Sequence, residues 1–152
     1  MTVKNLLKKG YRIAMEESAC GNALNAAALY GNFEIVECLG KYHKDIGSIV
    51  NLPLIAEHIW RNTKNVFTQL LKAESGVLIS HNVVEAAARN WNSGKEVMML
   101  LLEKRGADVV ITEEVVKAAA GNWRSGKEVM MLLLGKRGAD VDHRRGSDGN
   151  CE

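Results

Sequence analysis

Hydrophobic positions along the chain fall into short, dense blocks separated by turn residues. Six successive apolar residues run from Val129 to Leu134, and the same six run from Val97 to Leu102. Such a block covers the whole circumference of a helix, which predicts a helix over about 127–136 that packs against neighbours on nearly every side. The methionines of both blocks are therefore expected in the core rather than in an adaptable binding groove: Met98, Met99, Met130 and Met131.

A second kind of segment precedes each block and carries an alanine triplet, which suits close approach between helices. For the triplet at 118–120, Thr112 is a suitable N-cap, and the following glutamates place negative charge in the first turn of a helix. This helix is expected to end near Gly121. The residues 122–126 then read as a turn between the two helices.

The glycine after each block marks the expected end of the second helix. Gly106 and Gly138 occupy this place, and glycine readily adopts the left-handed conformation that closes many helices. One structural unit is thus predicted to be a helix, a turn, a second helix and a glycine stop.

The unit is repeated. Residues 81–108 align with 113–140 at a shift of 32, and 22 of the 28 aligned residues are identical. A fixed period of this length is typical of repeat proteins, in which each unit buries its apolar face against its neighbours. We therefore predict an all-α stack with helix pairs near 22–42, 51–73, 82–105 and 113–137. Residues 2–10 read as a partial unit that exposes Leu6 and Leu7, and residues 142–152 are expected to be a disordered tail.

The segment 21–39, GNALNAAALYGNFEIVECL, resembles an ankyrin repeat, and the Gly-Ala-Asp endings at 106–108 and 138–140 are similar to the end of that repeat. The opening Gly-Asn-Ala-Leu resembles arrays found in large fungal proteins. The resemblance implies a right-handed α-solenoid that binds other proteins without catalysis. Only three residues, 109–111, separate two units, so the projecting hairpin finger of the ankyrin family is expected to be missing there.

The charge balance and the cysteine content restrict the classes of partner and the cellular compartment that are expected for the chain. The net charge is +2, from 20 basic and 18 acidic residues, which is too balanced to indicate nucleic acid or an anionic membrane as the partner. The three cysteines share no short spacing, and this indicates a reducing, cytoplasmic environment, with the nucleus also possible. No apolar run is long enough to span a membrane.

No catalytic constellation is visible. The four histidines are scattered, the serines lack the setting of a nucleophile, and the repeated Ser-Gly-Lys-Glu departs from a phosphate-binding loop because a helix rather than a strand precedes it. We therefore expect no enzyme activity, no cofactor, no metal and no small-molecule substrate.

Trp60, Trp91 and Trp123 recur once per unit at the end of the first helix. Such a ladder could stack nucleic-acid bases, but the balanced charge favours a structural role in which each indole packs over its turn and the neighbouring unit. Single-stranded nucleic-acid binding is kept as a minor alternative.

The leading hypothesis is a protein-binding scaffold that presents the polar face of its first helices and turns to another protein or another domain of a longer chain. A second hypothesis, implied by the fungal resemblance, is a recognition or regulatory segment of a larger nucleotide-driven, NLR-like receptor. The candidate contact residues are Glu57, Arg61, Glu85, Arg89, Lys117 and Arg124.

Overall fold

The computed structural model describes residues 17–43, 45–72 and 76–147. Within these ranges the chain forms eight α-helices and no strand, so the expected all-α class is confirmed for the described part. The partial unit at 2–10, with Leu6 and Leu7, lies outside the described residues, as do residues 148–152 of the expected tail.

The helices follow one another in pairs joined by short turns. Each range that was expected to contain a helix pair holds two helices. Their bounds are α2 (Glu17–Leu29) with α3 (Phe33–Tyr42), α4 (Leu52–His58) with α5 (Thr63–Leu70), α6 (His81–Arg89) with α7 (Gly94–Arg105), and α8 (Glu113–Gly121) with α9 (Gly126–Ser147). Short 3₁₀ turns occupy Ile46–Ser48 and Gly106–Asp108.

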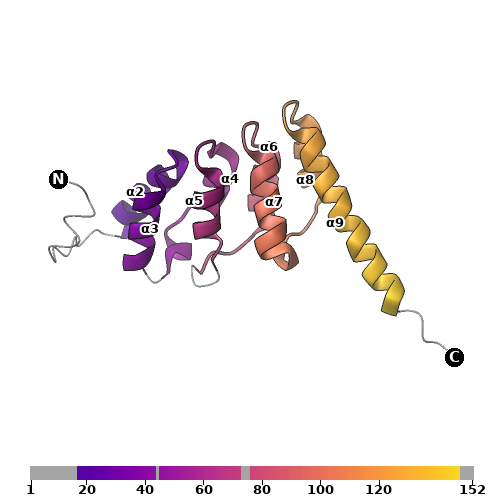
Figure 1. The fold of residues 1–152 in the computed structure, drawn as a ribbon, viewed down its shortest axis with the longest axis horizontal. Helices are drawn as coiled ribbons and strands as arrows, with labels where there is room; N and C mark the ends of the chain where they lie inside the picture. The colour runs from indigo at the N-terminus through magenta and orange to yellow at the C-terminus, as the bar shows by residue number, and fades with distance from the viewer. Residues whose placement is uncertain (1–16, 44, 73–75, 148–152) are drawn as a thin grey trace.

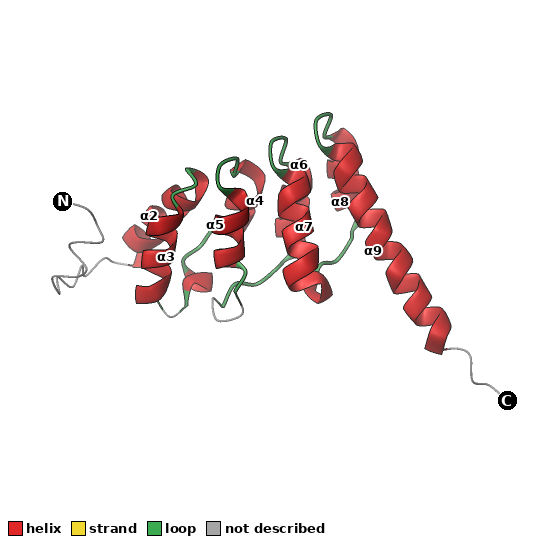
Figure 2. Cartoon of the chain, in the orientation of Figure 1, coloured by secondary structure: helices red, strands yellow, loops and turns green. Residues whose placement is uncertain are grey.

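The pairs stand side by side in a row, with their internal turns along one edge and the connectors between pairs along the other (Figure 1; Figure 2). The first helices of successive pairs contact one another, α2 with α4, α4 with α6 and α6 with α8. The second helices do the same, from α3 through α5 and α7 to α9. Two layers of helices result, and the core lies between them.

The core is built from aliphatic residues and alanine. Phe67, Leu70, Leu101 and Val97 are fully buried, and Ala87 and Ala88 bring α6 close to its neighbours. Because each pair has one apolar side toward each neighbour, a single continuous core runs through the described part of the row.

The prediction that the whole circumference of the second helices is buried is wrong. Met98 is fully buried, but Met99 is 45% exposed and Met131 is 65% exposed. One side of each second helix forms the outer surface of the second layer, and Met99 of α7 and Met131 of α9 are exposed there. Met130 is partly buried, so two of the four methionines expected in the core lie at the surface.

The predicted end of the second helix is confirmed at Gly106, which is the C-cap of α7, but the left-handed conformation predicted for this glycine is wrong. At Gly138 the predicted helix end itself is wrong. Gly106 has right-handed backbone angles, φ −56° and ψ −33°, and α7 ends by tightening into a 3₁₀ turn. Gly138 lies inside α9, which continues to Ser147. Residues 142–147, expected to belong to a disordered tail, are therefore helical.

The predicted N-cap of α8 is confirmed. The Thr112 hydroxyl accepts a hydrogen bond from the Val115 N–H at 3.4 Å. At the same helix start the Glu114 carboxylate accepts hydrogen bonds from its own backbone N–H and from the Thr112 side chain, with Lys117 and His81 nearby. These contacts hold the pKa of Glu114 below its ordinary value of 4.5.

This lowered pKa gives a pH-dependent prediction. Because the folded chain favours the charged carboxylate, its stabilising effect is present above pH 4.5 and is lost as the pH falls through the lowered folded-state pKa. We expect Glu114→Gln to lower the urea midpoint at neutral pH and to leave it unchanged in acid below that pKa. Urea titrations at the two pH values measure this difference, and a deficit of equal size in acid would contradict the assignment.

Candidate functional site

The turns inside the helix pairs are held by buried asparagines. Asn90 and Asn122 are 1% and 4% exposed, and each follows directly after the first helix of its pair. The Asn90 Oδ1 atom accepts from the N–H groups of Asn92 and Ser93 at 3.0 and 2.8 Å. Asn122 holds the next turn in the same way, with Arg124 and Ser125 as donors. An asparagine that closes its own turn makes the turn rigid.

The same asparagines connect one helix pair to the one before it. The Nδ2 atom of Asn90 donates to the carbonyl oxygens of Ala56 and Ile59, both at 2.9 Å. The Nδ2 atom of Asn122 donates to Ala88 and Asn90, at 2.9 and 3.1 Å. We call these residues, together with the more exposed Asn62, which donates to the Gly31 carbonyl at 3.2 Å, the asparagine ladder. It ties all four turns into one continuous edge.

Hydroxyl groups and glycines complete this edge. The Ser125 hydroxyl donates to the Asn90 carbonyl at 2.9 Å, and Thr63 donates to Ser93 at 3.1 Å. A Cβ atom on Gly126 would collide with the carbonyl oxygen of Ala119. The glycine of the repeated Ser-Gly-Lys-Glu therefore allows two helices to pack closely. This packing role explains the motif without a bound phosphate.

An exposed aromatic side chain projects from each of the four turns. Their exposed fractions are 76% for Tyr30, 52% for Trp60, 58% for Trp91 and 78% for Trp123. We call these four residues the aromatic row; their turns lie along the same edge of the molecule (Figure 2). The expectation that each indole is buried over its turn is wrong: the residue before each tryptophan, Asn90, Asn122 or Ile59, occupies the buried place beneath the turn and leaves the ring outside.

Neighbouring side chains hold the aromatic row in place. The rings of Trp91 and Trp123 lie 6.4 Å apart between centroids, tilted by 57°. The Arg61 guanidinium lies 4.3 Å from the centre of the Trp60 ring, which is within the range of a cation–π interaction. Arg124 reaches across to the preceding turn, where its Nη1 atom donates to Asn92 Oδ1 at 3.1 Å.

The six predicted contact residues divide into two groups. Arg61 and Arg124 lie in the turns beside the aromatic row, and Arg89 is the last residue of α6, next to the turn that holds Trp91. Glu57, Glu85 and Lys117 lie within first helices. Glu85 is paired with Arg89, and Lys117 with Glu113 at 2.7 Å. The sequence reasoning missed Tyr30 and the buried asparagines, although the repeated Asn-Trp dipeptide was the available signal for the latter.

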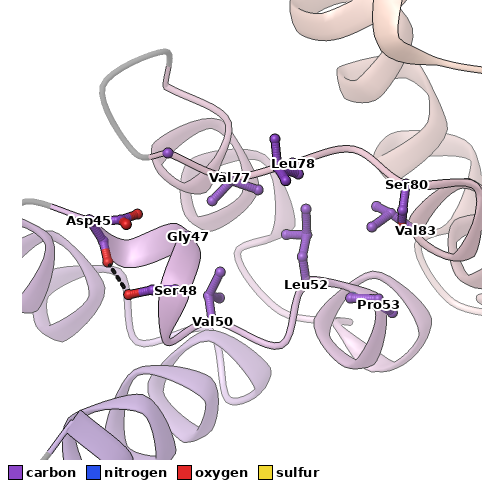
Figure 3. Close-up of a pocket in the computed structure, with 11 residues that line it drawn as sticks. Asp45, Gly47, Ser48, Val50, Leu52, Pro53, Val77, Leu78, Ser80 and Val83 are labelled. Carbon is purple, nitrogen blue, oxygen red and sulfur yellow. Dashed lines mark hydrogen bonds between the residues drawn. The ribbon is translucent and has the colours of Figure 1, made fainter.

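Two of the depressions among the described residues lie near the connectors and the turns. One, of about 300 Å³, lies between the connectors 45–50 and 76–80 and the start of α4, and its wall is mostly apolar (Figure 3). Its Ser48 hydroxyl donates to the Asp45 carbonyl at 2.9 Å and so has a local structural role. The other, of about 420 Å³, lies beneath the aromatic row, between α5 and α7, and carries both charge signs, from Lys64 and Lys95 to Glu96 and Glu103.

The described side chains form no cluster of three or more histidine, cysteine, aspartate or glutamate residues that could hold a metal ion. None of the described helices is long and apolar enough to cross a membrane.

Comparison with known proteins finds one family. Residues 70–98 and 100–130 each match a domain of unknown function, DUF7104. Each match spans a connector, one first helix, its asparagine turn and part of the flanking second helices, so the matched unit contains one step of the ladder. No curated protein and no solved structure matches the chain.

Proposed function

We propose that the chain is a non-catalytic protein-binding module, an ankyrin-like α-solenoid with a right-handed stack, whose aromatic row binds another protein or another domain of a longer chain. The observation that carries this proposal is the exposure of one aromatic side chain on each of four turns along a single edge. Exposed aromatic residues in a row remove much apolar surface from water when a partner covers them.

The composition of the edge supports a protein partner. Tryptophan, tyrosine and arginine contribute most of the binding energy in protein interfaces, and the edge combines the aromatic row with Arg61 and Arg124. The ladder keeps the turns rigid, and a surface that is already ordered loses little conformational entropy on binding. The depression between α5 and α7, which includes Asn92 and Ser93 of one turn, carries charges of both signs, and this favours a protein over a polyanion.

Affinity capture with variants tests the proposal. The full chain, the double variant Trp91→Ala/Trp123→Ala and the variant Leu78→Ala are used as bait under the same conditions. Leu78 is 83% exposed but lies on a connector between pairs, so it is the matched control for loss of an exposed apolar side chain. We expect the double variant to weaken partner binding by roughly 30-fold or more, while Leu78→Ala binds normally.

The melting temperature separates binding from folding. Because the two indoles are mostly exposed, their removal should change it by only a few degrees. A partner captured equally by the double variant would overturn the assignment to the aromatic row. If charge reversal by Glu85→Lys/Arg89→Glu instead removes that partner, the contact lies on the first-helix face.

Single-stranded nucleic acid is the second candidate, because the indole rings are exposed rather than buried. Against it stand the tilt of the Trp91 and Trp123 rings and the charges of both signs in the depression between α5 and α7. Titration with oligonucleotide at low and moderate salt, followed by tryptophan fluorescence, tests it: quenching that weakens with salt would support this candidate.

A further inference from the structure

The last two helix pairs contain the same residues in different surroundings, and this difference identifies a second interaction surface. Val84, Ala88 and Met98 are all fully buried in the α6–α7 pair. Their counterparts in the α8–α9 pair are Val116 and Met130, both partly buried, and Ala120, which is exposed. Since these three residue types are the same in both pairs, we attribute the difference to the α8–α9 pair, which packs against α6 and α7.

The uncovered residues form one surface across α8 and α9. Leu132 is partly buried where the equivalent Leu100 is 5% exposed, and Leu134 is 60% exposed. We call this set the end face; it consists of Val116, Ala120, Met130, Leu132 and Leu134. Four of its counterparts in α6 and α7 are buried, and the fifth, Leu102, is partly buried.

Hydrogen-bond acceptors continue onto the end face. The carbonyl oxygens of Ala88 and Asn90 accept hydrogen bonds from the Asn122 side-chain amide. The Asn90 carbonyl oxygen also accepts a hydrogen bond from the Ser125 hydroxyl. The equivalent carbonyl groups one pair later belong to Ala120 and Asn122. They lie in the same backbone geometry, because Gly126 N–H bonds to the Asn122 carbonyl at 2.9 Å as Gly94 N–H bonds to that of Asn90 at 3.1 Å.

We propose that the end face binds a further helical hairpin of the same kind, one whose turn carries Asn-x-x-Ser. The asparagine amide of this hairpin donates to the carbonyl groups of Ala120 and Asn122, and its small apolar residues cover the end face. The end face continues the interface between the α6–α7 and α8–α9 pairs, and hairpin binding there is independent of the function proposed for the aromatic row.

The same comparison predicts a change in α9. Residues 104–108 and 136–140 are both Lys-Arg-Gly-Ala-Asp, yet the first ends in a 3₁₀ turn with Arg105 Nε donating to Asp108 Oδ2 at 2.6 Å, and the second is helical. The turn lies where the chain passes on to a following pair. A docked hairpin that continues the chain should therefore convert 138–140 from helix to the same turn.

The test adds a second copy of residues 109–140 directly after Asp140 in the full chain. We expect the extended chain to unfold in a single transition at a higher urea midpoint than the parent. The increase should disappear when the added copy of Asn122 is replaced by alanine, or when Leu132 of the receiving end face is replaced by glutamate. Leu132→Glu in the parent is the matched control: this side chain is partly buried against the core there, so the midpoint should fall, but by less than in the extended chain, where the added hairpin also covers it.

Two results would overturn the proposal. One is a separate, earlier transition for the added copy, with the chemical shifts of 138–140 still helical. The other is a parent chain that sediments as a dimer and becomes monomeric on Leu132→Glu, since a second copy of the chain would then cover the end face.

Discussion

Replacing Asn90 by alanine is expected to lower the free energy of unfolding by about 3 kcal/mol. The side chain is 1% exposed, and the change removes four hydrogen bonds at once. The carbonyl groups of Ala56 and Ile59 and the Ser93 N–H would lose these partners in a buried setting, and each such group costs about 1 kcal/mol or more. Chemical denaturation of the purified chain measures the loss.

Asn92 is the matched control for this experiment. It has the same side chain two positions later in the same turn, but it is exposed and its Oδ1 atom accepts only from Arg124 among the bonds described above. Asn92→Ala should change the free energy of unfolding by no more than about 0.5 kcal/mol. Equal losses for the two variants would mean that the turn itself, rather than the asparagine ladder, carries the stability.

Gly31→Ala should destabilise the chain by a similar amount, about 3 kcal/mol, for steric reasons. Gly31 has φ +70°, a region that residues with a Cβ rarely adopt, and an added Cβ would lie 2.5 Å from the carbonyl oxygen of Arg61 in the next turn. Backbone atoms surround this position, so a side-chain rotation cannot relieve the contact. The loss is again read from the urea midpoint.

Gly40→Ala provides a control of opposite sign. Gly40 lies inside α3, where an added Cβ would meet only Gln69 Nε2, at an ordinary contact distance of 3.8 Å. Alanine is a better helix former than glycine, so this variant should be more stable by up to about 1 kcal/mol. A neutral Gly31→Ala variant would show that the first two turns are further apart than described here.

Local rules were sufficient to predict where most helices lie. The duplication, the alanine triplets and the N-cap at Thr112 each depend on neighbours close in sequence, and α8 begins and ends where they predict. The predictions that failed depend on contacts between units. Gly106 and Gly138 follow the same two residues, Lys-Arg. Among the described residues another helix pair follows Gly106, where α7 ends in a 3₁₀ turn, whereas α9 continues through Gly138.

The exposure of the aromatic row likewise could not be predicted from local sequence. From the sequence alone, a tryptophan repeated once per unit is equally compatible with a buried anchor and an exposed contact. The outcome is decided by Asn90 and Asn122, whose small amides fill the inside of the turn and make hydrogen bonds that an indole could not make. Recognition of the repeated Asn-Trp as one motif, buried amide followed by exposed ring, would have placed both residues correctly.

The asparagine ladder also bears on how such a chain changes over generations. Each step joins a unit to the one before it through the same side-chain amide, so unequal exchange between the nearly identical stretches 81–108 and 113–140 would insert or delete a whole unit and leave every remaining step intact. Each event would add or remove one exposed aromatic ring. The valency of the binding edge, and with it the avidity for an extended partner, could therefore be adjusted in single steps without a new fold having to evolve.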